Sequence, residues 1–287
     1  MLSSLGGVLF DGFAYGMLLF LLSVGLSVTL GMMNFVNLAH CSFAMIGGYT
    51  TVMLMNKAGW PFFATLPMAF VAAGVVAVVL EKIFFRRLYR ASDLDQCLLT
   101  IGLVFISVAA FAWFFTTEQQ SARIPDYLKG SVQFMGISFA VYRIFLVVIA
   151  LLVTALLVVA LEKTRFGAQV RASVDNQRMA RGLGIDVDRA FLITFALGGG
   201  LAGLGGALAI EIIGLDPSFA LTYLVYVLIV VAVGGLGSIG GSFAAAVVLG
   251  ISDMAGKYYF PWLGAFLIYL VMVGLLMWRP VGLFGKR

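Results

Sequence analysis

Long, uninterrupted apolar runs are the feature that most constrains what this chain can fold into. Nine of them, each 15 to 24 residues long, follow one another between short polar stretches. A helix crosses a bilayer with about 20 apolar residues. Because the runs are continuous rather than alternating, they predict helices and not barrel strands. The runs span residues 8–31, 39–56, 62–85, 97–116, 140–161, 190–213, 221–235, 241–256 and 262–278.

The charge content agrees with a membrane protein. Only 11% of the residues are charged and 62% are hydrophobic, whereas a soluble domain carries about 25% charged residues. This composition excludes a soluble enzyme, a disordered chain and a secreted disulfide scaffold. We therefore expect an all-α, polytopic transmembrane helical bundle of about 8–10 spans, including discontinuous helices, that forms a single domain over residues 1–287.

Lys and Arg predict the orientation of the spans. If the segments alternate in direction, 13 of the 18 basic residues fall on one side, in the stretches 82–90, 163–189 and 279–287. The positive-inside rule makes that side cytoplasmic, which places the C-terminus inside and permits an outside N-terminus. The net charge of +5 is a topology signal of this kind, and we expect no nucleic-acid binding.

The first interruption of the helical pattern is GMMNFVNLAHCS, residues 31–42. It places Asn34, Asn37, His40 and Ser42 inside an otherwise apolar region. Backbone groups freed by such a break are costly in hydrocarbon, so breaks persist where they line an enclosed or hydrated cavity. These four residues are candidates for lining a substrate path. Alternatively, the Asn and His side chains satisfy one another or a neighbouring carbonyl.

The second interruption is GGLGSIGGS, residues 234–242. Gly permits non-helical backbone and weakens a helix. Discontinuous helices offer free donors and acceptors to a polar ligand, so they indicate a transport site. We assign Gly234, Gly235 and Ser238 to the candidate path. The alternative is a tight cytoplasmic turn with no contact to substrate.

Two nucleotide-binding motifs are excluded. Gly235, Gly237 and Gly240 match G-x-G-x-x-G, but that fingerprint requires a βαβ unit, and here both flanks are apolar spans. The P-loop pattern G-x-x-x-x-G-K-[ST] does not occur, so we expect no ATP hydrolysis by this chain. The single His and two Cys have no metal-ligand spacing, and we expect no catalytic residues.

Small residues in segment 190–213 predict close helix packing. Gly199 and Gly203 form G-x-x-x-G, and Ala207 extends the same face. Such a face allows two helix backbones to approach closely, which is the main source of attraction between helices in lipid.

Acidic residues near the spans could mark a proton relay. Asp11, Glu211 and Asp253 all lie near the outer ends of their segments, where a carboxylate can reach water. An ion-coupled carrier would more often hold such groups at mid-depth, so we do not favour ion coupling.

The polar stretch 164–190 lies between two spans on the cytoplasmic side. Ser173 or Asp175 could cap a short helix that runs to about Arg181, and Gly182 or Gly184 could end it. We expect this helix to dock on a soluble motor protein, with Met179 and Ala180 filling a groove. The alternative is a solvated basic loop that only fixes topology. The residues assigned to docking are Arg171, Asp175, Met179, Ala180 and Gly184.

Three motifs together resemble one family, the permease subunits of branched-chain amino acid ABC transporters, in their LivH-like branch. They are MNFVNLAHCSFAMIGGY (33–49), RFGAQVRASVDNQRMARGLGIDVDRAFLITF (165–195) and GGLGSIGGSFAAAVVLG (234–250). The third motif resembles the family's G-G-x-G-S-x-x-G-A segment. The sequence departs from the family's pattern at Cys41, Ser42 and Gly240. These positions lie in the two interrupted stretches that are candidates for the substrate path, so they bear on the identity of the solute more than on the type of transporter.

The resemblance implies partners and a location. It implies a second permease subunit, two ATP-binding cassette ATPases that use ATP and Mg, and a periplasmic binding protein that delivers the solute to a multi-pass protein in the lipid of the bacterial inner membrane. The chain itself would hold no cofactor and no metal. The solute would be a branched-chain or hydrophobic amino acid, or a related small polar solute.

Other functions stay open at this stage. Within the family, the same machinery carries urea, amides or a sugar. From a different class, a solitary ion-coupled carrier or passive channel would need none of the partners. An intramembrane enzyme is the least favoured, because His40 has no convincing nucleophile or metal partner and the motif H-E-x-x-H does not occur.

Overall fold

The fold is built from helices that coincide with the nine apolar runs. We describe it from a computed structural model, which covers residues 2–33, 35–89, 91–122, 124–134 and 137–285. The helices that match the runs are α1 (Leu2–Met33), α2 (His40–Asn56), α3 (Phe62–Leu80), α5 (Asp93–Phe115), α6 (Val141–Glu162), α9 (Val187–Ile213), α10 (Phe219–Gly234), α11 (Ile239–Tyr259) and α12 (Gly264–Trp278).

Six of these helices are long and apolar enough to cross a membrane, and two shorter apolar helices, 219–234 and 266–278, accompany them. The predicted all-α polytopic bundle is therefore confirmed.

The connections hold the remaining elements. A π-helix (Glu81–Phe85) and α4 (Arg86–Leu88) extend α3, while α7 (Arg165–Asp175) and α8 (Gln177–Gly182) follow α6. Between α5 and α6 lie a 3₁₀ turn (Asp126–Leu128) and a hairpin of β1 (Ser131–Phe134) and β2 (Ile137–Ala140). The two strands are antiparallel, with Ser131 paired to Ala140.

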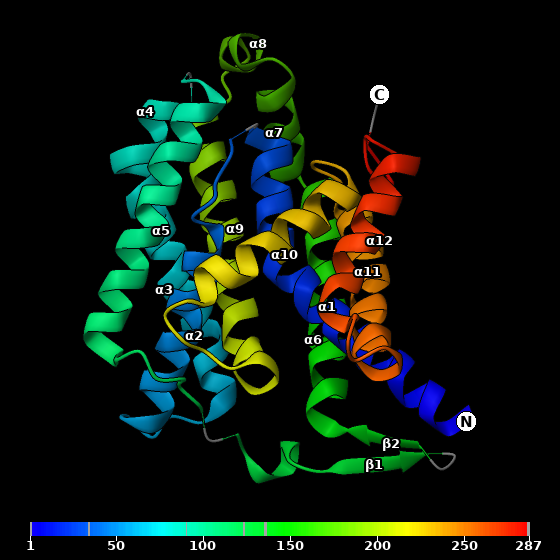
Figure 1. Cartoon of the computed structure of the whole chain (residues 1–287). Helices are drawn as coiled ribbons and strands as arrows, with labels where there is room; N and C mark the ends of the chain where they lie inside the picture. Colours follow the sequence, from blue (N-terminus) through cyan, green and yellow to red (C-terminus); the bar gives the residue numbers. More distant parts are fainter. Residues whose placement is uncertain (1, 34, 90, 123, 135–136, 286–287) are drawn as a thin grey trace.

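The two ends of the molecule differ as the charge pattern predicts. Figure 1 shows α4, α7, α8 and the C-terminus at one end, and the N-terminus with the β1–β2 hairpin at the other. The stretches rich in Lys and Arg all belong to the first end. We call it the cytoplasmic end and the opposite one the outer end.

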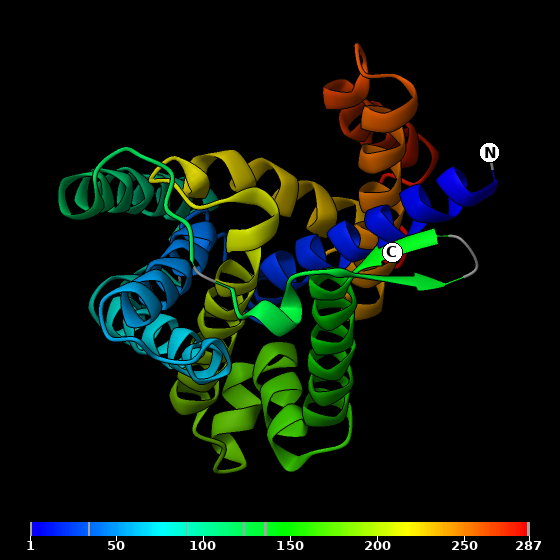
Figure 2. The same ribbon diagram turned by 90° about the horizontal axis from the view of Figure 1, so that it is seen from below.

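α1 and α9 form the centre of the bundle. In their span windows, 89% and 72% of the residues are buried, against 11% in α5. α1 packs chiefly against α9 and α11, and Figure 2 shows it passing between α6 on one side and α10 and α11 on the other. α10 crosses the front of the bundle obliquely (Figure 1).

Glycines set the spacing of the central helices. The expected packing face of α9 is confirmed: a methyl group on Gly203 would overlap Cβ of Ala73 on α3, and one on Gly206 would overlap the carbonyl oxygen of Ala44 on α2. Gly25 on α1 meets Gly198 of α9 in the same manner. α9 therefore touches three helices at backbone distance, where dispersion contacts are densest.

We predict that Gly206→Ala destabilises the fold by about 2 kcal/mol, because the new methyl group has to displace backbone and not a flexible side chain. Thermal unfolding in detergent, followed by tryptophan fluorescence, measures the change. Gly102→Ala in α5 is the matched control, since nothing lies within 4 Å of its added Cβ, and it should be neutral or mildly stabilising. Equal melting of the two variants would contradict the packing role.

Candidate functional site

The first interruption is an extended stretch between α1 and α2. α1 ends at Met33, residues 35–39 are not helical, and α2 begins at His40. Figure 1 shows this stretch descending from the cytoplasmic end of α1 into the bundle, so that α2 starts below that end. The predicted break of the helix is confirmed. Asn34 lies outside the described residues.

Side chains of α5 satisfy the backbone of this stretch. Gln96 Oε1 accepts a hydrogen bond from the amide of Val36 at 2.9 Å, and Thr100 Oγ1 accepts one from the amide of Leu38 at 3.2 Å. In the first turn of α2, the hydroxyl of Ser42 lies 2.8 Å from that of Ser107 on α5. α5 thus presents a row of polar groups to the interruption.

The sequence carries a signal for this row, although none of its residues was among those we predicted. Gln96, Thr100 and Ser107 are spaced by four and seven residues, so they share one face of a helix. A polar stripe on an otherwise apolar span indicates a buried hydrogen-bonding partner rather than lipid.

Asn37 and His40 are buried within the chain, each 1% exposed. Asn37 Oδ1 accepts a hydrogen bond from the amide of Ala39 at 3.1 Å, and His40 Nε2 lies 3.1 Å from the carbonyl oxygen of Leu22 on α1. Among the described residues, Asn37 Nδ2 and His40 Nδ1 have no partner. His40 thus bonds a neighbouring carbonyl, as one of the two sequence interpretations held, and each side chain retains one unused polar atom.

The second interruption separates α10 from α11. α10 ends at Gly234, and the hydroxyl of Ser238 caps α11 by accepting a hydrogen bond from the amide of Gly241 at 3.0 Å. Gly235 and Gly237 adopt φ values of +96° and +78°, which side-chain-bearing residues rarely adopt. The turn requires glycine at these two positions.

The C-terminal segment covers this turn. The amides of Leu283 and Phe284 donate hydrogen bonds to the carbonyls of Val233 and Gly234, at 2.7 and 3.1 Å. These bonds use two carbonyls that the end of α10 leaves free. Gly235 is buried beneath the segment, and a methyl group on it would meet the backbone of Gly285.

The last turns of α1, just before the first interruption, touch the second interruption. A methyl group on Gly31, at the end of α1, would overlap Cα of Gly237. One turn away, the hydroxyl of Ser242 donates to that of Ser27 at 2.9 Å, a contact between residues 215 positions apart. The sequence predicted both breaks but not this contact, because nothing in either motif specifies its spatial neighbour.

The predicted docking stretch forms two short helices rather than one. Thr164 caps α7 by accepting from the amide of Gly167, and Asn176 caps α8 by accepting from the amide of Met179. The capping prediction was therefore wrong: Ser173 lies inside α7, where its hydroxyl bonds the carbonyl of Gln169. Asn176 takes the capping role because it directly follows the end of α7 and can begin a new helix.

The loop residues differ in exposure. Asp175 is exposed at the end of α7, while the guanidinium of Arg171 donates to the carbonyl of Leu161 and so ties α7 to the end of α6. Met179 and Leu183 are 63% and 78% exposed. Gly184 follows α8 with φ +81°.

Ala180 does not lie on the exposed face. It is 2% exposed and packs against Val187 and Phe191, so it cannot enter a partner's groove as we expected. The sequence did not predict this burial, because Ala180 is covered by residues of α9, which folds back over the loop. Of the two apolar side chains predicted to dock, only that of Met179 is exposed.

An aromatic cluster joins this loop to the first interruption. The ring of Phe191 lies 5.8 Å from that of Tyr89, and Tyr89 lies 5.6 Å from Phe35. Phe35 also contacts Phe85 and Phe195, with ring centroids 5.2 and 6.4 Å away. Packed rings of this kind transmit displacement because an interior without voids does not compress.

Glu81 anchors the cluster from the π-helix. Its side chain is fully buried, and its Oε1 accepts hydrogen bonds from Tyr89 Oη at 2.9 Å and from Arg86 Nε at 3.3 Å. Burial, and then the Glu81 carboxylate, raise the pKa of the Tyr89 hydroxyl, so this hydroxyl remains a donor. π-helical turns are frequent at functional sites. Glu81 was not among the residues predicted from the sequence.

Comparison with known proteins decides the family. The family described as "Branched-chain amino acid transport system / permease component" matches residues 8–276. The chain belongs to this family. The resemblance inferred from the three motifs is therefore confirmed, and the permease is a multi-pass membrane protein. No solved structure matches it.

Curated relatives cover nearly the whole permease. It is 28% identical to a probable branched-chain amino acid transport permease protein, LivH, of Methanocaldococcus jannaschii, over 94% of this chain and 90% of the relative. It is 24% identical to the high-affinity permease protein BraD of Pseudomonas aeruginosa, over 97% and 95%. It is also 26% identical to LivM of Salmonella typhimurium, over 93% of this chain and 68% of the relative.

We predict that Thr100→Val in the permease lowers stability by about 1–3 kcal/mol, because the partly buried amide of Leu38 loses its acceptor, the buried Thr100 hydroxyl. Thr154→Val is the matched control: its hydroxyl bonds only the carbonyl of Ala150 within α6, and its loss should cost under about 1 kcal/mol. Thermal unfolding in detergent compares the two. Equal losses would show that α5 does not hold the interruption in place.

Proposed function

We propose that this permease is the membrane subunit of an ATP-binding cassette importer and that it passes branched-chain or other hydrophobic amino acids across the membrane. The contact between the end of α1, just before the first interruption, and the turn after α10 carries the proposal, because the chain belongs to a transport permease family. The proposed solute follows from the relatives, which are branched-chain amino acid transport permeases.

The solute path runs along the two interruptions. We assign to it the free polar atoms of Asn37 and His40 and the hydroxyl of Ser42, together with the turn that follows α10. Because the side chains of Asn37, His40 and Ser42 are buried, the path is closed at the first interruption. We expect it to open where Gly31 meets the exposed turn at Gly237. The path residues are Asn34, Asn37, His40, Ser42, Gly234, Gly235 and Ser238.

ATP drives this opening from outside the chain. Two ATPase subunits with bound ATP and Mg dock on α7, α8 and the turn at Gly184, while a periplasmic binding protein delivers the solute at the outer end. A movement of α8 reaches Phe35 through Phe191 and Tyr89, whose rings are in contact. The permease then alternates between outward and inward access and performs no catalysis itself.

A second permease completes the transporter. The relatives include both LivH and LivM permease proteins, which supports a pair of different subunits. We place the assembly in the bacterial inner membrane.

Uptake by proteoliposomes tests the proposal. The permease, its second permease, the ATPases and the binding protein are reconstituted, and radiolabelled leucine is offered with and without internal ATP. We expect uptake only with ATP and the ATPases. Uptake that persists without the ATPases under an ion gradient would contradict the ATP-driven mechanism. Uptake of urea, acetamide or a pentose in place of leucine would contradict the proposed solute.

We predict that Met179→Glu lowers ATP-driven uptake at least about tenfold, because a buried charge without a partner weakens a docking contact. Co-purification of the ATPases with the permease measures the same loss directly. Met277→Glu is the matched control, since Met277 is 82% exposed at the cytoplasmic end of α12, away from α8. If both variants retain their ATPases equally, α8 is not the docking element.

A further inference from the structure

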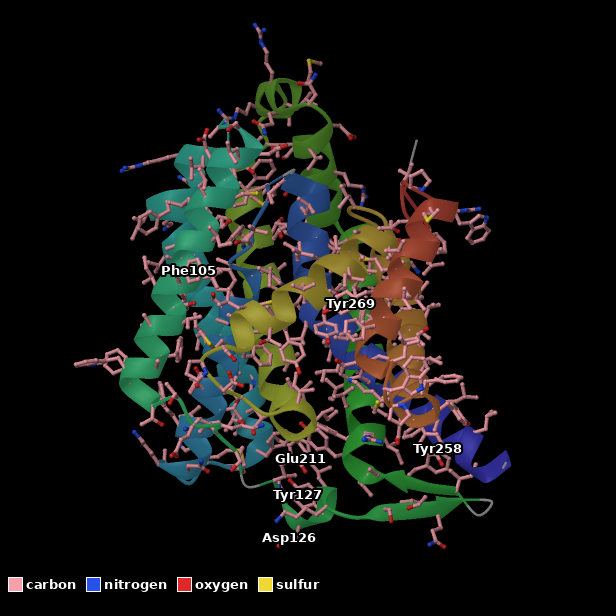
Figure 3. The ribbon with its side chains drawn as sticks, in the orientation of Figure 1. Phe105, Asp126, Tyr127, Glu211, Tyr258 and Tyr269 are labelled. Carbon is pink, nitrogen blue, oxygen red and sulfur yellow. The ribbon has the colours of Figure 1, made fainter. Side chains whose placement is uncertain are left out.

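A small cavity opens at the outer end of the molecule, between α1 and α11. Its volume is about 220 Å³. Figure 3 places Tyr258, one of its lining residues, near the outer end of α11 and beside the first turns of α1. The lining residues are Val8, Asp11, Met254, Lys257 and Tyr258.

One wall of the cavity carries an ammonium group with donors to spare. Lys257 Nζ lies 2.6 Å from Asp253 Oδ2 and 5.4 Å from the ring centroid of Tyr15. Asp253 is 1% exposed, whereas Lys257 is 50% exposed. Because an ammonium has three N–H donors, Lys257 can bind Asp253 and still donate into the cavity.

The buried carboxylate that pairs with Lys257, that of Asp253, has one oxygen without a hydrogen bond from the residues that the structure describes. Among the described residues, Asp253 Oδ1 has no hydrogen-bond partner. An ionised carboxylate without such bonds is costly inside a protein. The cost is offset while the Lys257 ammonium stays beside it, which holds this cation at the cavity wall.

The opposite wall carries a carboxylate. Asp11 forms an ion pair with Arg143, and its side chain is 35% exposed. A carboxylate has about four acceptor sites, so Asp11 can bind Arg143 and accept further hydrogen bonds from a ligand. The cavity therefore offers one donor group and one acceptor group of opposite charge.

Apolar side chains form the rest of the lining. They are Val8, Met254 and Tyr258. An apolar lining with a few placed polar groups is the usual composition of a small-molecule site.

We propose that this cavity binds the free zwitterion of an apolar amino acid. The α-carboxylate contacts Lys257, the α-ammonium contacts Asp11, and the side chain lies against Val8 and Met254. The inference rests on the proposed function, since a solute arriving from outside meets this end first. The ethanolamine headgroup of a phospholipid has the same pair of charges, and the experiment separates it from a free amino acid.

Equilibrium binding tests the charge pattern. Radiolabelled leucine is bound to the assembled permease–ATPase complex without the binding protein, in nanodiscs of phosphatidylglycerol. Leucinamide lacks the carboxylate and 4-methyl-2-oxopentanoate lacks the ammonium, so each should compete at least about tenfold more weakly than leucine, because each loses a charge-assisted hydrogen bond. Competition by glycerophosphoethanolamine stronger than that of leucine would assign the cavity to a lipid headgroup and overturn the proposal.

Variants locate the binding. Asp11→Asn removes the acceptor charge and Met254→Trp fills the cavity, and each should weaken leucine binding at least about fivefold with unchanged thermal stability. Asp126→Asn is the matched control: Asp126 is ion-paired with Lys129 at 2.9 Å at the same end, and Figure 3 shows it well away from Tyr258.

The outcomes distinguish the cavity from the importer. Wild-type binding by both cavity variants, or no leucine binding by a complex that takes up leucine with ATP, would overturn this site and leave the proposed function standing. Weakened binding in both variants supports the site. A complex that binds leucine at this cavity but shows no ATP-driven uptake would keep the site and remove the proposed function.

Discussion

Every backbone amide and carbonyl inside a bilayer needs a partner within the protein, and this constraint governs how the helices are interrupted. An amide left unpaired in hydrocarbon costs several kcal/mol. The stretch 35–39 is tolerated because Gln96 and Thr100 accept its amides. The turn after α10 is tolerated because the C-terminal segment donates to its carbonyls. Each interruption thus depends on an element far from it in the sequence, and moving that element is a way to open the interruption.

Close backbone packing by glycine makes the closed arrangement specific. α9 meets α1, α2 and α3 at glycine contacts, and Gly31 at the end of α1 meets Gly237 in the turn after α10. A rigid centre around α1 and α9 leaves the more loosely packed α5 and the oblique α10 as the elements able to shift. Backbone contacts without side chains separate without rotamer changes, so the Gly31–Gly237 contact can open at little conformational cost.

The sequence predicted the elements well and their neighbours poorly. Apolar run length and Lys/Arg placement were enough for the helices and their direction, because both follow from transfer to the bilayer, a property of each segment alone. The breaks at 31–42 and 234–242 were found through local Gly and polar content. The contacts between particular residue pairs could not be predicted. Examples are Gly31 with Gly237, Ala180 with Phe191, and Glu81 with Tyr89. Such contacts depend on how helices distant in sequence come together, and no single motif encodes them.

The placement of charge separates this permease from an ion-driven carrier. Within the described part of the chain, the fully buried carboxylates of Glu81 and Asp253 lie near opposite ends of the bundle, and each is paired with a cation on its own chain stretch, Arg86 and Lys257. Glu211 also lies at the outer end (Figure 3). The polar side chains at the interruptions are hydroxyls, an amide and an imidazole, and in the proposed function they exchange hydrogen bonds with the solute without moving an ion. The proposed conduit would need work delivered from elsewhere, and the aromatic contacts from Phe191 to Phe35 connect the first interruption to the cytoplasmic loop.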